Sequence, residues 1–185
     1  MFKNILVAID RSAANKEVFD YALKLARATK GKLILLHVLS GAEEGSPIMS
    51  HYSTVYPTIG DHYMHLSPHV SHMANELYHR QWQAFETEGM DILRSFAKKA
   101  IAVGVTTEFT QITGYPSSTI CEFAQSCDAG VIVIGRRGLS GLQEMLLGSV
   151  SNYVVHHAPC SVLLVHTLEA QEQNFPSEDK ESIAS

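Results

Sequence analysis

The sequence predicts a single doubly wound α/β domain, in which helices cover both faces of a mostly parallel β-sheet. Five short apolar runs alternate with segments of helical periodicity, and this alternation is typical of the class. The runs are nearly continuous in hydrophobic residues, as expected for strands buried on both faces. A length of 185 residues suits one compact domain of this kind.

The first strand, helix and second strand form one βαβ unit. Residues 3–9 form a nearly continuous apolar run that is rich in β-branched residues, and Asp10 ends it. Ser12 or Asn15 is expected to cap the following helix. That helix ends at Lys30, with Gly31 as the expected C-terminal glycine. Residues 32–39 are a second buried strand.

A long irregular segment interrupts the alternation, and a long helix follows it. Residues 41–72 are interpreted as a His-rich inserted loop, either functional or mobile, because the connection exceeds the usual length. Pro68 fits the first position of a helix that continues to Ala102, with Ser67 as its N-cap. Gly89 is expected either to kink this helix or to pack closely against a neighbour.

The remainder of the chain continues the α/β alternation and ends in a polar tail. Residues 1–167 are predicted to form the domain, and residues 168–185, which have no apolar period, are expected to be disordered. The predicted elements are a strand over 105–112, a helix over 117–127, a strand over 131–134, a helix over 149–157 and a strand over 161–165.

Composition argues against several classes of function. The 14 Lys and Arg against 19 Asp and Glu give a formal net charge of −5, which disfavours binding to nucleic acid or to anionic lipid. No apolar run approaches the roughly 20 residues that a membrane helix needs. Three cysteines without a C-x-x-C pair argue against a disulfide scaffold and favour a reducing, cytoplasmic compartment.

The glycine-rich segment after the fourth strand predicts a phosphate site. In open parallel sheets, ligands bind beyond the carboxyl ends of the strands, where the strand order reverses. Gly135 and Gly138 follow the fourth strand, and Gly148 with Ser149 opens the next helix. The first amides of a helix have no intrahelical partner and attract anions. The alternative is a tight strand–helix crossover without a ligand.

Asp10 and Val38 lie at the ends of the first two strands and suit the ribose and the base of a nucleotide. The Asp10 carboxylate is suited to accept hydrogen bonds from ribose hydroxyls, as an acidic residue does in dinucleotide-binding folds. Val38 lies at the strand end where an adenine base needs an apolar slot and backbone partners. The alternative for Asp10 is a helix cap or a turn residue.

Several motifs together resemble the universal stress protein family, in its ATP-binding branch. The spacing Gly135-x2-Gly138-x9-Gly148-Ser149 is similar to the family's nucleotide-binding signature. The resemblance covers roughly residues 1–40 and 90–167. Its other motifs, in family order, are Ile5-Leu6-Val7-Ala8-Ile9-Asp10-Arg11-Ser12, Leu36-His37-Val38, Gly114-Tyr115-Pro116 and Ala158-Pro159-Cys160-Ser161-Val162-Leu163-Leu164-Val165.

The resemblance implies a Rossmann-like five-stranded sheet of order 3-2-1-4-5, a homodimer formed through the fifth strands, and a bound ATP or related adenine nucleotide. It implies ribose contacts from Asp10 and Gly135, an adenine contact from the Val38 backbone, and phosphates bridged by Mg²⁺. Arg136 is expected either to reach phosphate or to remain a solvated cation. The nucleotide-binding candidates are Ala8, Ile9, Asp10, Val38, Gly135, Arg136, Gly138, Gly148, Ser149, Val150 and Ser151.

Histidines are concentrated in the inserted segment, with six of the ten between His51 and His79. His69, His72 and Glu76 have the spacing i, i+3, i+7 and would share one helix face, as metal ligands do. No Cys is nearby and no recognised metal motif is present. A polar loop, an oligomer contact and a pH-sensitive lid are the alternatives to a metal site.

The function favoured by these patterns is that of a nucleotide-binding stress-response regulator. The chain has neither a G-x-x-x-x-G-K-[ST] loop nor kinase catalytic motifs, and we assign no catalytic residue. We expect the nucleotide-dependent state of a loop to control oligomerisation or binding of an unidentified protein partner. The alternatives are a slow Mg²⁺-dependent ATPase or phosphotransferase and a His-rich metal-binding assembly protein.

Overall fold

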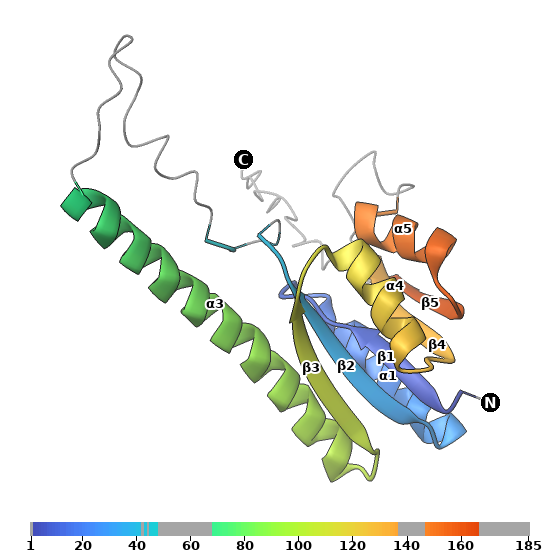
Figure 1. The fold of residues 1–185 in the computed structure, drawn as a ribbon. Helices are drawn as coiled ribbons and strands as arrows, with labels where there is room; N and C mark the ends of the chain where they lie inside the picture. Colours follow the sequence, from blue (N-terminus) through green and yellow to red (C-terminus); the bar gives the residue numbers. More distant parts are fainter. Residues whose placement is uncertain (1, 42, 44, 48–67, 137–146, 167–185) are drawn as a thin grey trace, which may run out of the picture.

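The structure is a computed structural model, and it describes residues 2–41, 43, 45–47, 68–136 and 147–166. Five parallel strands form one sheet of order β3-β2-β1-β4-β5, flanked by helices (Figure 1). The fold class and strand order predicted above are therefore confirmed. The elements are β1 (Asn4–Ala8), α1 (Asn15–Thr29), β2 (Lys32–Leu39), α3 (Pro68–Ala102), β3 (Thr107–Thr113), α4 (Pro116–Ser126), β4 (Val131–Arg136), α5 (Ser149–His157) and β5 (Ser161–His166).

The core consists of two layers of side chains, one on each face of the sheet. Successive side chains of a strand point to opposite faces, so alternate residues separate into two clusters. One cluster joins strand residues such as Val7 and Leu35 to α1 and α3. The other joins residues such as Leu6 and Leu36 to α4 and α5. Three of the five residues of β1 and seven of the eight residues of β2 are buried, which explains their continuous apolar runs.

The central strand is the first to leave the sheet at the carboxyl edge. β1 ends at Ala8, which lies beside Leu36, while β2 continues to Leu39 in register with β3. On the other side, Val7 lies beside Val133, and β4 continues to Arg136 in register with β5. The sheet edge is therefore notched at β1, at the point where the strand order reverses.

The predicted cap of α1 is wrong. Its N-cap residue is Ala14, with no side-chain cap hydrogen bond. Ser12 and Asn15 instead bind Asp10: the Ser12 hydroxyl donates to Asp10 Oδ1 at 2.5 Å, and the Asn15 amide donates to the Asp10 carbonyl at 3.2 Å. The turn after β1 thus uses both polar side chains that sequence patterns assign to the helix end.

The C-terminal end of α1 also differs from the prediction. Lys30, with φ 54° and ψ 35°, adopts the left-handed conformation that was expected of Gly31. Gly31 is required for a different reason, since a Cβ there would lie 2.6 Å from the Phe2 carbonyl oxygen. The other predicted element boundaries lie within one or two residues of the observed ones.

Helix α3 begins and ends at the residues predicted, Pro68 and Ala102. Residues 68–72, at the end of the range predicted as an inserted loop, are helical, whereas residues 48–67 lie outside the described part of the chain. The helix continues through Gly89, where a Cβ would lie 2.5 Å from His37 Nδ1. Close packing is therefore the correct alternative for Gly89. Among the described residues, no helical segment combines the length and the hydrophobicity that a membrane span requires.

We expect Gly89→Ala to lower the free energy of unfolding by about 1–3 kcal/mol, because the added methyl overlaps a buried imidazole. Inside a helix this substitution normally stabilises, by about 1 kcal/mol. Urea unfolding measures the difference. Gly41→Ala is the control, since among the described residues no atom other than those of its chain neighbours lies within 4 Å of a Cβ at Gly41. A Gly89→Ala variant as stable as the wild type would contradict the close contact.

Candidate functional site

The turn that follows β1 holds Asp10 at the carboxyl edge. Ile9 is buried, and its N–H donates to the Leu36 carbonyl at 2.9 Å, so the chain leaves the sheet only at Asp10. Besides the Ser12 hydroxyl, the Ser12 N–H donates to Asp10 Oδ1 at 3.0 Å. Asp10 is thus a turn residue in this structure, and the turn fixes its carboxylate beside the notch, just beyond Ala8. The ribose contact stays a prediction.

The backbone of Val38 points to the side of β2 from which β1 has departed. The Leu36 carbonyl accepts from Ile9 on the β1 side, and the Leu39 carbonyl accepts from Gly114 on the β3 side. Because peptide groups alternate along a strand, the N–H and C=O of Val38 point like those of Leu36. The Val38 side chain is buried among residues on the α4 and α5 face. This orientation suits a planar base at the notch.

Gly135 has a packing role that the sequence does not reveal. A Cβ at this position would lie 3.0 Å from Val18 Cγ2, so a glycine allows α1 to pack against β4. Gly135 lies beside Val165 of β5, and Arg136 lies beside His166. Arg136 is half-buried at the end of β4, and neither of its predicted roles is tested. Gly138 lies outside the described residues.

The first turn of α5 presents backbone amides. Gly148 is the N-cap, and the first helical hydrogen bond runs from the Asn152 N–H to the Gly148 carbonyl at 2.8 Å. The amides of Ser149, Val150 and Ser151 precede that bond and have no acceptor within the helix. Ser151 is buried, and its hydroxyl donates to the Gly148 carbonyl at 3.0 Å. Since α5 leads back to a parallel strand, this turn lies at the carboxyl edge.

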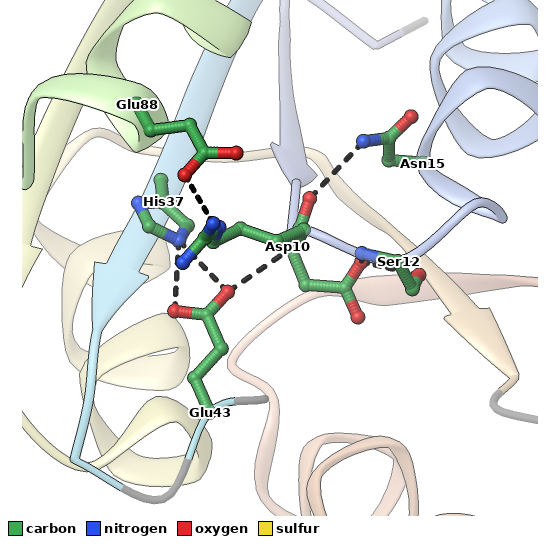
Figure 2. Close-up of polar contacts among 7 residues, drawn as sticks. Asp10, Ser12, Asn15, His37, Glu43 and Glu88 are labelled. Carbon is green, nitrogen blue, oxygen red and sulfur yellow. Dashed lines mark hydrogen bonds and ion pairs between the residues drawn. The ribbon is translucent and has the colours of Figure 1, made fainter. Parts of the chain in front are cut away.

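A buried polar network, which we did not predict, lies behind the strand ends (Figure 2). His37, 2% exposed, places Nε2 3.0 and 3.1 Å from the two carboxylate oxygens of Glu43. The Arg11 N–H donates to Glu43 Oε1 at 3.2 Å. The Arg11 guanidinium pairs with Glu88 and lies 4.4 Å from the Phe85 ring centroid. A histidine inside an otherwise apolar strand was the one sequence signal of a buried partner.

The three cysteines are free thiols on the α4 and α5 side of the sheet. Burial raises the pKa of Cys121, and the charge of Glu122 raises it further. Burial likewise raises the pKa of Cys127 and of Cys160. Because the thiolate is the reactive form, thiols with raised pKa values are poor nucleophiles at neutral pH. Their environment suits small hydrophobic residues better than catalysts.

The histidine pattern of the inserted segment is the candidate metal site that the sequence offers. His69, His72 and Glu76 all belong to α3. The side chains of the two histidines lie outside the described residues, and Glu76 is exposed. Within the described ranges, no group of three or more His, Cys, Asp or Glu side chains is arranged to hold a metal ion. The metal hypothesis for these residues therefore stays untested.

Comparison with known proteins agrees with the observed architecture. The model of the Universal stress protein family matches residues 1–166. The universal stress protein Sll1388 of Synechocystis sp. is 35% identical over 164 residues, covering 89% of this chain and 97% of that protein.

Two solved structures share the fold. A universal stress protein in complex with cAMP superposes with a TM-score of 0.55 and 23% identity, covering 89% of this chain and 97% of that chain. A universal stress protein family protein from Arabidopsis thaliana with AMP bound has a TM-score of 0.55 and 22% identity, covering 95% of this chain and 97% of that chain.

The raised thiol pKa values predict slow alkylation in the folded protein. We expect the pH at which the iodoacetamide rate is half-maximal to be higher in native protein than in urea, because folding favours the protonated thiols. Rates measured between pH 7 and 11, with mass spectrometry to assign each site, test this. A shift in the pH midpoint reports a change in thiol ionisation, whereas restricted access of the reagent lowers the rate without moving the midpoint. Identical midpoints in both states would contradict the raised values.

Proposed function

Because the chain belongs to the universal stress protein family, we propose that it is a stress-response regulator that binds an adenine nucleotide at the carboxyl edge of its sheet. The observation that carries this proposal is the notch at β1. Asp10 lies just beyond the end of β1, and the Val38 backbone points to the space that β1 has left. The amides of the α5 first turn supply an anion site at the same edge.

Each part of a nucleotide matches a different part of the edge. The Val38 N–H and C=O would pair with adenine, and the Asp10 carboxylate would accept from the ribose hydroxyls. The amides of Ser149 and Val150 would bind phosphate beside Gly148, which has no side chain of its own to block the approach. Secondary contacts in the same proposal come from Ala8, Ile9, Gly135, Arg136, Gly138 and Ser151.

The nucleotide we propose is ATP or a related adenine nucleotide. Two structural neighbours contain cAMP and AMP, which share with ATP an adenine, a ribose and at least one phosphate. Mg²⁺ is part of the proposal, with phosphate oxygens as its main ligands. Such ions are commonly held by substrate phosphates with one or two carboxylates, and Asp10 would be one such carboxylate.

We also propose that nucleotide binding controls assembly through β5, in a cytoplasmic protein. Within the described part of the chain, β5 is an edge strand and the neighbouring helix α5 exposes apolar side chains, so a sheet edge and apolar surface coincide. The phosphate turn is the start of α5, and α5 is the element that directly precedes β5 in the chain. A nucleotide that binds one state of this region more tightly would shift the assembly equilibrium. The free thiols support a reducing compartment.

Gly148→Val should weaken ATP binding at least about tenfold, because a β-branched side chain would block the approach of phosphate to the α5 amides. Gly148 has φ −59° and ψ 154°, a conformation open to valine, so the fold should be retained. Calorimetry with ATP, AMP and cAMP, each with and without Mg²⁺, measures the effect.

The matched control is Ala158→Val, at the other end of the same helix with φ −63° and ψ 139°. This variant should bind ATP like the wild type. Unchanged affinity in Gly148→Val, or equal losses in both variants, would count against the phosphate site.

Leu163→Arg should weaken a β5-mediated dimer at least about tenfold, because it buries an unpaired cation at the interface. Leu163 is 36% exposed on the edge strand β5. Phe109→Arg is the control, since Phe109 is 39% exposed on the opposite edge strand, β3. Light scattering over a concentration series reports the dimer fraction. A larger loss in the Phe109 variant would assign the interface to β3.

A further inference from the structure

Glu43 is a carboxylate that a surface turn directs into the protein. The turn after β2 is held by the Glu43 N–H donating to the Ser40 carbonyl at 3.2 Å and the Ser46 N–H donating to the Glu43 carbonyl at 3.1 Å. The Glu43 side chain is only 7% exposed. Loop glutamates are normally solvated, and a buried carboxylate is costly unless it is hydrogen-bonded. The groups that contact the Glu43 carboxylate therefore indicate its role.

The partners of Glu43 belong to two different strand ends. Its carboxylate contacts His37 Nε2, near the end of β2, and accepts from the Arg11 N–H, in the turn after β1. His37 is packed against Gly89 of α3, so the imidazole has a fixed position from which to hold the carboxylate. Figure 2 shows dashed lines from the Glu43 carboxylate to His37 and to the turn that follows Asp10. Glu43 thus ties the turn after β1 to β2.

The peptide that Glu43 holds is the one that joins Asp10 to Arg11. Its N–H donates to Glu43, and its carbonyl, that of Asp10, accepts from the Asn15 amide. A peptide fixed at both its N–H and its C=O leaves Asp10 little freedom of ψ. Ser12 in turn fixes the Asp10 carboxylate. The orientation of Asp10 is therefore determined before any ligand arrives.

We propose that Glu43 is a positioning residue for ribose recognition, a role that rests on the proposed function. By holding the Asp10–Arg11 peptide, Glu43 keeps the Asp10 carboxylate oriented for the ribose hydroxyls, so binding requires no reordering of the turn. A preorganised acceptor discriminates between ligands better than a mobile one. The reason is that binding does not have to offset the conformational entropy lost in ordering the acceptor. Glu43 itself lies behind the strand ends, on the side of His37, and touches no ligand.

The Arg11–Glu88 pair provides a matched control for this role. Glu88 contacts the Arg11 side chain rather than the Asp10–Arg11 peptide. Its side chain is 60% exposed, and exposed ion pairs contribute little. The Phe85 ring still covers the guanidinium when Glu88 is neutralised. Glu88→Gln therefore changes the same network without releasing Asp10.

The test compares binding of ATP with binding of 2′,3′-dideoxy-ATP, which lacks both ribose hydroxyls. In the wild type we expect ATP to bind about tenfold more tightly, as hydrogen bonds to a charged acceptor allow. Glu43→Ala should lower this ratio to about threefold or less, while Glu88→Gln should preserve it. Glu43→Gln should restore most of the ratio, because its amide oxygen still accepts from the Arg11 N–H. Calorimetry supplies both affinities for every variant.

Each other outcome overturns the inference in a distinguishable way. Equal losses for both ligands in Glu43→Ala, with the ratio kept, would make Glu43 merely structural while the proposed nucleotide site stands. A wild type that binds both ligands equally would remove the ribose role of Asp10. A wild type that binds neither would end the proposed function and this inference together. Should Glu43→Ala fail to fold, Asn15→Ala releases the same peptide at its carbonyl and must also lower the ratio.

Discussion

The early departure of β1 from the centre of the sheet is the constraint on which the rest of the structure depends. β1 is the shortest strand, and its neighbours β2 and β4 continue beyond it in register with β3 and β5. Backbone groups of β2 past Leu36 consequently lose their partner strand, and buried peptide groups need partners. In the function proposed here, the adenine base would supply the backbone partners that Val38 lacks once β1 has ended.

The polar network behind the notch shows how that departure is stabilised. A strand that leaves a sheet early exposes the turn that follows it to alternative conformations, each of which would move Asp10. His37 and Glu43 are nearly as buried as the apolar core, and a buried charged group is tolerated only when it is well partnered. Their contacts, with the packing of Arg11 on Phe85, connect β1, β2 and α3 at one point. In the proposed function, this fixed geometry of the strand ends would help the site to discriminate between ligands.

Several residues that suggest a ligand site also have packing roles. Gly135 belongs to a nucleotide-type glycine pattern, yet its lack of a side chain is required by Val18 of α1. Ser151 follows the glycine signature, yet its hydroxyl serves the Gly148 carbonyl. The candidate site and the packed interior therefore share residues in this fold. Variants such as Gly148→Val, at a position with ordinary backbone angles, separate the two roles better than changes at Gly135 would.

The sequence by itself determined the strands, the helices, the sheet class and the family, because hydrophobic period and glycine spacing are local properties of the chain. It also located Asp10 and the start of α5 at strand and helix ends. Only the tertiary structure decided which side chains meet: Ser12 and Asn15 with Asp10 rather than with α1, and His37 with Glu43. Hydrogen-bond partners are chosen by position in space, and no local pattern records the contact between a strand histidine and a loop glutamate.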